Sequence, residues 1–276
     1  MIKCAMEKLL LGRIVVLDRY FSERGSKQWM KRHIRDPYVR ASREMNYRSR
    51  AAFKLIDIDS KYKLLKPGMK VLEIGSAPGS WTQVITKKVK SKSDDPRVVA
   101  VDVLKMNSVS GAIFIQGNIF SKQTHELIDK AIGSEGVSLV CSDAAPEFVG
   151  EEDDDYEATV RLNYEILEIA KKYLLNGGNF LMKAMQGRIE QKMKVNIKKS
   201  FEMMTYVKPQ ASRGESKEIY ILARGYSAGI KQKKEVKKEM KKEEKKEVKK
   251  LDLSKAALDK DIIRKALLRH KVRSKD

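Results

Sequence analysis

Residues 71–81, which read VLEIGSAPGSW, constrain the fold of this chain more than any other segment. An apolar stretch ends on a carboxylate and runs into two glycines just where a helical pattern begins. Glycine has no Cβ and adopts positive φ readily, so such a strand–glycine–helix turn lets the backbone approach a nucleotide-like ligand closely. A glycine turn between a strand and a helix is also an ordinary connection. The segment therefore predicts a cofactor pocket only if the rest of the chain supports one.

Strand-like and helix-like patterns alternate between about residues 36 and 226. Strands are predicted at 70–74, 97–103, 112–117, 137–142, 178–184, 203–208 and 218–224. Helices are predicted at 47–62, from a cap at Ser80 through residue 89, at 121–132 and at 156–175, the last stopped by the turn Asn176-Gly177-Gly178. This alternation favours an α/β fold, a Rossmann-like doubly wound sheet of seven mostly parallel strands with helices on both faces.

The charge balance points to a polyanionic partner. The net charge is +21 and the isoelectric point is near 9.7. Residues 231–276 contribute +10 of that charge, so the rest of the chain is basic in its own right. Such a chain should bind nucleic acid or an anionic membrane surface. No apolar run approaches the roughly 18 residues of a membrane-spanning helix, so we expect a soluble protein with no membrane partner.

Cysteine and histidine usage gives no sign of a metal site or a disulfide framework. Cys4 and Cys141 lie far apart, and the three histidines share no ligand-like spacing with them. Cys141 stands in an apolar run, as a buried structural thiol does, and a reducing compartment fits. The acidic run at 151–155 precedes a predicted helix, whose amino-terminal dipole stabilises carboxylates. We therefore interpret that run as a helix start rather than a metal site.

Both ends differ in composition from the region between them. Residues 1–35 form a basic extension with an apolar patch, as organelle-targeting presequences do, although three acidic residues dilute that signature. Residues 227–276 form a tail that is almost wholly Lys and Glu over 231–250 and regains amphipathic spacing over 251–270, where we expect a short helix. The charged part is either a solvated tail or a nonspecific RNA-binding arm. The folded domain is accordingly predicted at 36–226.

Two polar residues follow the second and third predicted strands. Asp102 ends an apolar strand, where nucleotide-binding α/β folds place an acidic residue that accepts hydrogen bonds from ribose hydroxyls. Asn118 follows the next strand, where its amide could read an adenine edge or simply shape a turn. The glycine pattern is not the G-x-G-x-x-G of dinucleotide sites, and Pro78 interrupts it. S-adenosylmethionine is therefore a better cofactor candidate than NAD.

A carboxylate and a lysine also lie at or near the ends of predicted strands. Asp143 comes after the fourth predicted strand, and Lys183 lies near the end of the fifth within the stretch FLMKA. In open α/β sheets, ligands bind outside the carboxyl ends of strands, which is where both side chains should emerge. A lysine within an apolar strand is either an edge residue that snorkels to water or a functional amine. Beside an orienting carboxylate it is a candidate general base.

Five motifs, in this order and setting, resemble the FtsJ-type family of ribose 2′-O-methyltransferases over roughly residues 29–225. The motifs are YRSRAAFKL (47–55), EIGSAPGSW (73–81), SDAAP (142–146), MKAMQG (182–187) and SKEIY (216–220). The family's Lys-Asp-Lys-Glu tetrad falls on Lys54, Asp143, Lys183 and Glu218. The resemblance implies methyl transfer from S-adenosylmethionine to a ribose 2′-hydroxyl in RNA, without a metal. Lys183 would be the general base or the amine that polarises the hydroxyl, and the other three would support it.

The same resemblance assigns the residues that bind the cofactor. They are Glu73, Gly75, Ser76, Pro78, Gly79, Ser80, Trp81, Asp102, Asn118 and Asp143. Asn118 stands where many relatives carry aspartate, so its adenine contact would lack a charge. Asp143 would contact the cofactor amino group or orient Lys183, and both roles stay open.

The stretch KRHIRDPYV at 31–39 looks most like the bacterial and mitochondrial large-subunit ribosomal RNA uridine methyltransferases. The cations of residues 28–32 would grip phosphates, which positions RNA without specifying sequence. We therefore expect a monomeric enzyme that methylates a uridine of large-subunit ribosomal RNA. A transfer RNA ribose methyltransferase and a weakly active RNA-binding ribosome-assembly factor are the alternatives. The basic extension favours a mitochondrial location, and the charged tail, which compact bacterial members lack, leaves nucleolar and cytoplasmic locations open.

Overall fold

The computed structural model describes residues 34–228 except 148, 188 and 190. Seven strands form one sheet in the order β3-β2-β1-β4-β5-β7-β6. The strands are β1 (Val71–Ile74), β2 (Val98–Asp102), β3 (Ala112–Gln116), β4 (Val137–Ser142), β5 (Leu174–Met185), β6 (Phe201–Val207) and β7 (Glu218–Tyr226). This mostly parallel, Rossmann-like sheet confirms the predicted fold class.

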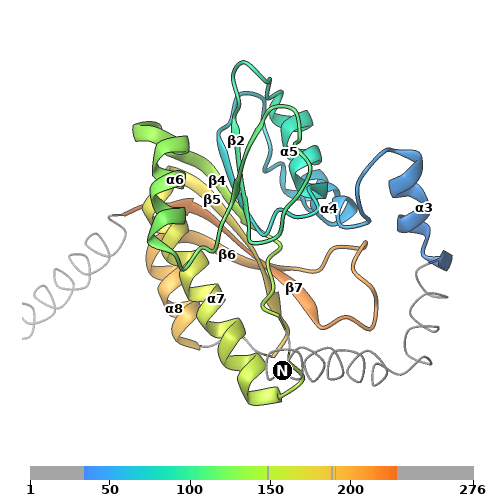
Figure 1. Ribbon diagram of the computed structural model, residues 1–276. Coiled ribbons are helices and arrows are strands. Elements are labelled where there is room, and N and C mark those ends of the chain that lie inside the picture. The colour runs from blue at the N-terminus through green and yellow to red at the C-terminus, as the bar shows by residue number, and fades with distance from the viewer. Residues whose placement is uncertain (1–33, 148, 188, 190, 229–276) are drawn as a thin grey trace, which may run out of the picture. The chain divides into compact units, whose positions relative to one another are not determined.

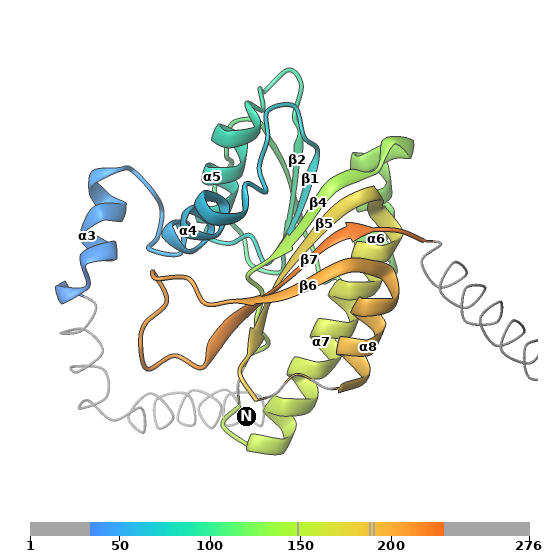
Figure 2. The same cartoon turned by 180° about the vertical axis from the view of Figure 1, so that it is seen from behind.

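Helices cover both faces of the sheet (Figures 1 and 2). The helices are α3 (Pro37–Glu44), α4 (Ala52–Tyr62), α5 (Ser80–Val89), α6 (Lys122–Ile132), α7 (Glu152–Tyr173) and α8 (Gln191–Ser200), with a 3-10 turn at Gly133–Glu135. Buried side chains of α6, α7 and α8 belong to one core cluster, and those of α4 and α5 belong to another. The domain is therefore a three-layer arrangement with the sheet in the middle.

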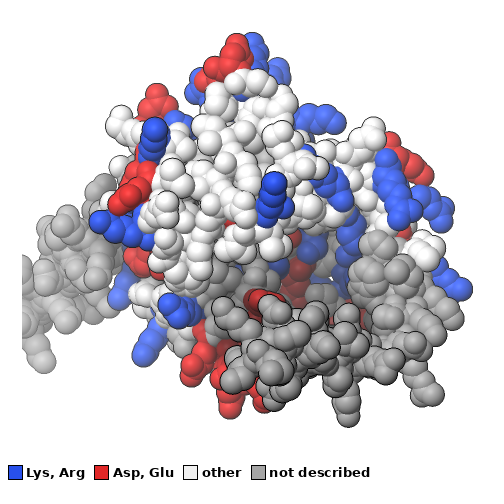
Figure 3. All heavy atoms as spheres, in the orientation of Figure 1, with Lys and Arg blue, Asp and Glu red and all other residues white. Residues whose placement is uncertain are grey.

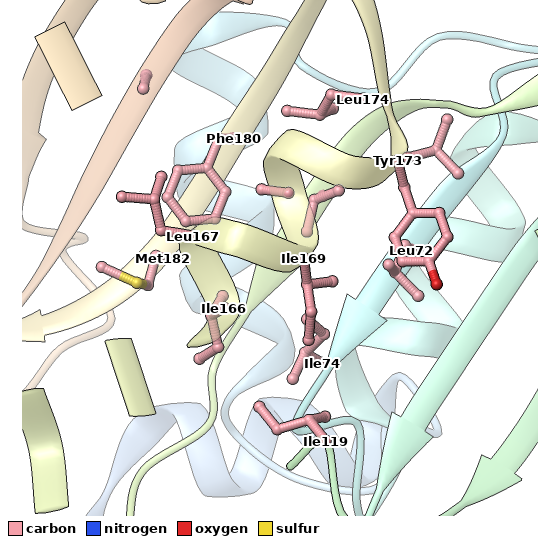
Figure 4. Packing of buried hydrophobic residues seen from close by; sticks show 14 of the residues in the cluster. Leu72, Ile74, Ile119, Ile166, Leu167, Ile169, Tyr173, Leu174, Phe180 and Met182 are labelled. Atoms are coloured by element: carbon pink, nitrogen blue, oxygen red, sulfur yellow. The ribbon is translucent and has the colours of Figure 1, made fainter. Parts of the chain in front are cut away.

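Alternation along the strands divides the core between these two faces. Leu72 of β1 and Phe180 of β5 pack against Ile166 and the rest of the apolar face of α7 (Figure 4). Their chain neighbours, among them Leu181, belong to the opposite cluster under α4 and α5. Strands covered on both faces read as continuous apolar runs, which is why the central strands were predictable from sequence.

One edge of the sheet, which we call the functional edge, contains one end of each of the seven strands. The pairs along β3-β2-β1-β4-β5 are parallel, whereas β7 runs antiparallel to both β5 and β6. The amino end of β7 therefore meets the carboxyl ends of the other six strands. The register pairs Lys183 with Tyr220 and Met185 with Glu218. Residues far apart in the sequence thus come together beside the end of β5.

The boundary between α7 and β5 differs from the prediction. The helix spans Glu152–Tyr173 rather than 156–175, and β5 begins at Leu174 rather than at 178. Leu174 pairs with Val137 of β4, so strand pairing ends the helix before the predicted asparagine-glycine turn is reached. The acidic run marks the start of α7, with Glu151 as the N-cap residue and residues 152–155 in the first turn. Asp155 accepts hydrogen bonds from the backbone N–H groups of residues 149 and 150 at 2.7 and 3.2 Å.

Other helix starts also differ. α4 begins at Ala52 rather than at residue 47, because the preceding turn is fastened to α5, where Gln83 Oε1 accepts a hydrogen bond from Arg48 N at 2.9 Å. α3 and α8 were not predicted. α3 does carry a start signal, because Asp36 caps it by accepting from Tyr38 N at 3.0 Å and proline follows the cap.

The predictions for the tail, and for nearly all of the amino-terminal extension, lie outside the described residues. Within the described part of the chain, no helix is both long and apolar enough to cross a bilayer. The same residues contain no group of three or more His, Cys, Asp or Glu side chains placed to hold a metal ion.

Candidate active site

A cavity of about 530 Å³ opens at the carboxyl edge of β1, β2 and β4, under the amino-terminal half of α7. Apolar side chains, including those of Ile74 and Leu162, form part of its wall. Five of the predicted site residues line it, namely Gly75, Asp102, Asn118, Asp143 and Lys183. The structure therefore brings predicted cofactor residues from the ends of four strands, β1 to β4, and one predicted catalytic lysine to the same space.

Gly75 lets two loops meet at this cavity. Its φ is +76°, and a Cβ built on it would lie 2.6 Å from the backbone N and Cα of Ala144. Any side chain would push the turn after β1 away from the loop after β4, in addition to the cost of a positive φ. The sequence assigned this glycine to close approach by a ligand, which stays a prediction; in the structure it also permits close approach by protein backbone.

Asp102 and Asn118 both combine a local structural bond with a place on the cavity wall. Asp102 accepts hydrogen bonds from Ala77 N at 2.7 Å and from Leu104 N at 2.8 Å. An ionised carboxylate has about four acceptor sites, so two bonds leave capacity for ribose hydroxyls. Asn118 Oδ1 accepts from Phe120 N at 3.0 Å, which is the turn role that the sequence left open. The adenine contact of Asn118 stays a prediction.

The four tetrad residues come together from four different elements, α4, the loop after β4, β5 and β7. Lys54 Nζ lies 2.8 Å from Glu218 Oε2 and 4.0 Å from Asp143 Oδ1. Lys183 Nζ lies 3.3 Å from Asp143 Oδ1 and also donates to the main-chain carbonyl of Asp143. All four side chains are at most 17% exposed. The amino groups of two lysines thus alternate with the carboxyl groups of Asp143 and Glu218 in a largely water-excluded cluster.

Two hydroxyl groups that hold these carboxylates were missed by the sequence analysis. Tyr220 OH donates to Asp143 Oδ1 at 2.7 Å, and Ser212 Oγ donates to Glu218 Oε1 at 3.0 Å. Burial raises the pKa of the Tyr220 phenol well above its usual value, so it stays a donor at neutral pH. Tyr220 shares a strand face with Glu218 two residues earlier, a spacing that could have signalled it. Ser212 lies in a loop and carries no comparable signal.

A comparison with protein families agrees with this geometry. The sequence model described as "FtsJ-like methyltransferase" matches residues 47–226, a range that contains the cavity lining and all four tetrad residues. The chain belongs to the FtsJ-like methyltransferase family. This confirms the family resemblance predicted from the five motifs.

Individual relatives support the same assignment. Ribosomal RNA large subunit methyltransferase E of Mesorhizobium japonicum is 41% identical over 201 residues, which are 73% of this chain and 76% of the relative. The protein of the same name from Pseudomonas fluorescens is 39% identical over 198 residues, 72% of this chain and 93% of the relative. A crystal structure from Plasmodium falciparum described as a ribosomal RNA methyltransferase has a TM-score of 0.56 and 28% identity, and covers 65% of this chain and 98% of its own. The predicted enzyme class, a methyltransferase, is confirmed.

Within this FtsJ-like domain, two predicted cofactor residues are buried beside the glycine turn rather than on the cavity wall. Glu73 is 1% exposed and accepts a hydrogen bond from Thr82 Oγ1 at 2.7 Å. Burial, aided by the nearby carboxylates of Asp143 and Asp102, raises the pKa of Glu73 to about 8 against the opposing effect of the Thr82 bond. Its carboxyl is therefore largely protonated at neutral pH. Ser76 is 2% exposed, and its hydroxyl has no partner among the described residues.

Four other predicted cofactor residues also do not line the cavity. They are Pro78, Gly79, Ser80 and Trp81. Gly79, not Ser80 as predicted, is the cap of α5, and Ser80 Oγ lies 2.7 Å from Ser49 Oγ. Trp81 is 2% exposed and donates its indole N–H to the carbonyl of Ala51 at 2.8 Å. These side chains fasten α5 to the segment before α4, and their contact with a cofactor stays a prediction.

Arg48 acts on the same turn, although the sequence analysis assigned it no role. Its guanidinium donates to the main-chain carbonyls of Pro78, Asn107 and Ser108 at 2.8, 2.7 and 2.7 Å. A Cβ on Gly79 would lie 2.3 Å from Arg48 Nη1, so the glycine makes room for the guanidinium. Arg48 thus ties the glycine turn to the loop after β2. The carboxylate of Asp102, at the end of β2, joins the same two segments.

Proposed function

We propose that this protein transfers a methyl group from S-adenosylmethionine to the 2′-hydroxyl of a uridine in large-subunit ribosomal RNA. The observation that carries the proposal is the cluster of two lysines and two carboxylates beside the cavity, in which Asp143 faces both Lys54 and Lys183. The relatives named large-subunit ribosomal RNA methyltransferases support the choice of RNA. The uridine rests on the resemblance carried by residues 31–39.

The cavity suits S-adenosylmethionine in size and in chemistry. A space of about 530 Å³ falls in the range of small-molecule sites. Asp102 would accept bonds from the ribose hydroxyls, Asp143 would accept from the amino group, and apolar side chains would contact the adenine. Ser76 lies in the sequence between Gly75 and Ala77, two residues of the cavity wall. Its buried hydroxyl has no partner among the residues that the structure describes, and a polar group of the ligand would satisfy it.

The reaction requires a ribose oxygen to be aligned and deprotonated. When bound, the cofactor supplies a methyl group already activated by a sulfonium. The chain's own residues would hold the 2′-oxygen in line with that methyl group and take up its proton. Lys183 lines the cavity, so its amine is the group that would receive the proton as the oxygen–carbon bond forms and the carbon–sulfur bond breaks. Asp143 would orient that amine through its carboxylate and its carbonyl.

Lys54 and Glu218 would position the other groups. Neither lines the cavity, and they pair with each other at 2.8 Å. Ser212 holds the second carboxylate oxygen of Glu218, and Lys54 faces Asp143. The pair would therefore keep the Asp143 carboxylate turned toward Lys183 and contact the ribose of the RNA.

A basic surface near α3 would receive the phosphates of the RNA. Figure 3 shows lysine and arginine side chains gathered on the side of the domain where α3 lies. Arg35, Arg40 and Arg43 are exposed there. Asp36, which caps α3, pairs with Arg50 at 2.9 Å and so fastens this basic helix to the segment that leads into α4. Cations in this setting would position RNA through its backbone.

A methyl-transfer assay tests the proposal. Labelled S-adenosylmethionine would be offered with large ribosomal subunits, naked ribosomal RNA and transfer RNA in parallel, followed by mapping of ribose methylation. We expect label on one uridine of large-subunit RNA, and none with the Lys183→Ala variant. Label confined to a transfer RNA would contradict the proposed substrate. Cofactor binding without label on any RNA would contradict the proposed activity and favour an assembly role.

A further inference from the structure

A second cavity, of about 450 Å³, lies between the end of β5, the end of β6 and α8. Its wall includes the aromatic ring of Tyr206, the apolar side chains of Val207 and Ile219, and two lysines, Lys194 and Lys208. No step of the methyl transfer described above uses these residues. We call this space the β6 cavity.

The β6 cavity is open to a ligand of negative charge. Tyr206 is 45% exposed, although it stands in a sheet strand. Lys194 on α8 is half-buried, and no carboxylate of the described residues pairs with it. Lys208 donates to the carbonyl of Ser216 at 2.8 Å, which keeps its amine beside the cavity. An aromatic wall, an apolar floor and two cations match the base and the phosphate of a nucleotide.

The β6 cavity also lies next to the tetrad. Ile219 directly follows Glu218 of the tetrad. Gln186, also on the cavity wall, donates its backbone N–H to the carbonyl of Lys217 at 2.7 Å. Gln186 comes three residues after Lys183, which corresponds to about 10 Å at the rise of a strand. Ile219 packs against the cluster under α7 and α8, whereas Tyr220, beside the tetrad, belongs to the cluster under α4 and α5. The two sites therefore adjoin across the functional edge of the sheet.

We propose that the β6 cavity binds a nucleotide that flanks the methylated one, with its base stacked on Tyr206 and its phosphate held by Lys194 and Lys208. This inference rests on the proposed RNA methyltransferase function. Unpaired bases of RNA are commonly held by stacking on aromatic side chains, and every base offers a face for it. The Gln186 amide carries a donor and an acceptor for the edge of the base. The cavity would thus require the target to stand in an unpaired stretch of RNA.

The first test separates RNA binding from catalysis, using the RNA that the wild-type enzyme methylates. Tyr206→Ala should raise the KM for RNA about tenfold, the size of one lost base stack, while kcat and the KM for the cofactor change less than about twofold. Met203→Ala is the matched control, because Met203 is 52% exposed on the same strand and does not line the cavity. An unchanged KM in Tyr206→Ala would overturn the inference.

A second test measures binding directly with a fluorescent single-stranded oligouridine of about twelve nucleotides. Lys194→Gln should lower the slope of log affinity against log salt by about 0.7, as expected for one lost phosphate contact, whereas Lys198→Gln, an exposed control on the same helix, should not. Tyr206→Phe should bind as the wild type does, and Tyr206→Leu, which keeps apolar bulk without a π face, should bind more weakly. Equal affinity of the Phe and Leu variants would overturn the stacking role.

The two tests together distinguish failure of the inference from failure of the proposed function. A wild-type enzyme that methylates no RNA contradicts the proposed function, while the oligouridine affinities still test the cavity. A wild-type enzyme that methylates RNA with kinetics insensitive to Tyr206 contradicts only the flanking-nucleotide site. Thermal unfolding of each variant identifies any that fail to fold. If Tyr206→Ala does not fold, the affinities of Tyr206→Phe and Tyr206→Leu still test the stacking role.

Discussion

The cofactor cavity and the tetrad adjoin each other but are built by different means. The cavity depends on backbone conformation, because Gly75 lets two loops meet while Asp102 and Arg48 bind main-chain groups within the glycine turn. The tetrad depends on side chains from four elements, joined by ion pairs such as Lys54–Glu218. The cavity should therefore be sensitive to local backbone changes, and the tetrad to the loss of single charged groups.

The largest effect should come from the tetrad. Lys183→Ala removes the proposed proton acceptor, so kcat should fall by about a thousandfold while cofactor affinity stays nearly unchanged. Single-turnover kinetics and calorimetric titration with S-adenosylmethionine measure the two quantities, and Lys198→Ala serves as a control. An equal loss of cofactor affinity would break the distinction between the two regions.

The next effect concerns the backbone of the cavity. Gly75→Ala should lower the free energy of unfolding by about 3 kcal/mol, because the new Cβ meets the backbone of Ala144 at a positive φ. Gly68→Ala is the matched control, since Gly68 also has a positive φ of +80° but no atom within 4 Å of a built Cβ. Urea unfolding should show a loss of only about 1 kcal/mol for the control. Similar losses in both variants would exclude loop approach as the cause.

The buried carboxyl beside the glycine turn should make stability depend on pH. The pKa of Glu73 is about 8 in the folded protein, above its ordinary 4.5, so the folded state binds this proton more tightly than the unfolded state. The free energy of unfolding should therefore fall as pH rises from 4.5 to 8, by about 2 kcal/mol between pH 6 and 8. Glu73→Gln should remove this slope, whereas Glu126→Gln, an exposed control, should keep it. Parallel pH profiles for Glu73→Gln and the wild type would contradict the assignment.

The smallest effect should separate cofactor binding from RNA binding. Arg48→Ala should weaken cofactor affinity about tenfold, because three main-chain carbonyls lose their donor and the glycine turn loosens. Arg48→Lys should recover part of the loss, since an ammonium cannot reproduce the planar fork of a guanidinium. Arg43→Ala on the exposed surface of α3 should instead raise the KM for RNA. If Arg48→Ala raises only the KM for RNA, then Arg48 contributes to RNA binding and not to cofactor binding.

Most strands were predictable because parallel strands covered on both faces are apolar throughout. α5 was predicted with its observed end and a start one residue late, because its apolar spacing follows directly on the glycine turn. The end of α7 was predicted incorrectly, because pairing of Leu174 with Val137 is a contact between segments distant in the chain. α8 carries few apolar residues, with Met193 and Ile197 its buried side chains, and its pattern was too weak to identify.

The candidate active site also divides into residues that the sequence identified and residues that only contacts between distant segments reveal. Motif matching identified the four tetrad residues, and their ion pairs bear out their proximity. It also assigned Trp81 to the cofactor; the structure buries that ring and gives its N–H to Ala51, and the cofactor contact stays a prediction. Arg48, Ser212 and the β6 cavity were not recognised, because their partners are carbonyls, carboxylates and side chains from distant segments.

By itself, the sequence determined the α/β class, the family and the types of group that the site would contain, because strand periodicity and motif order are local properties of the chain. Only the tertiary structure decided which predicted residues reach the cavity and which are buried beside it. The sheet order, with β7 reversed beside β5, brings Lys183 next to Tyr220 and places a second cavity across the same edge. Such contacts arise from the pairing and packing of distant segments, which no local pattern encodes.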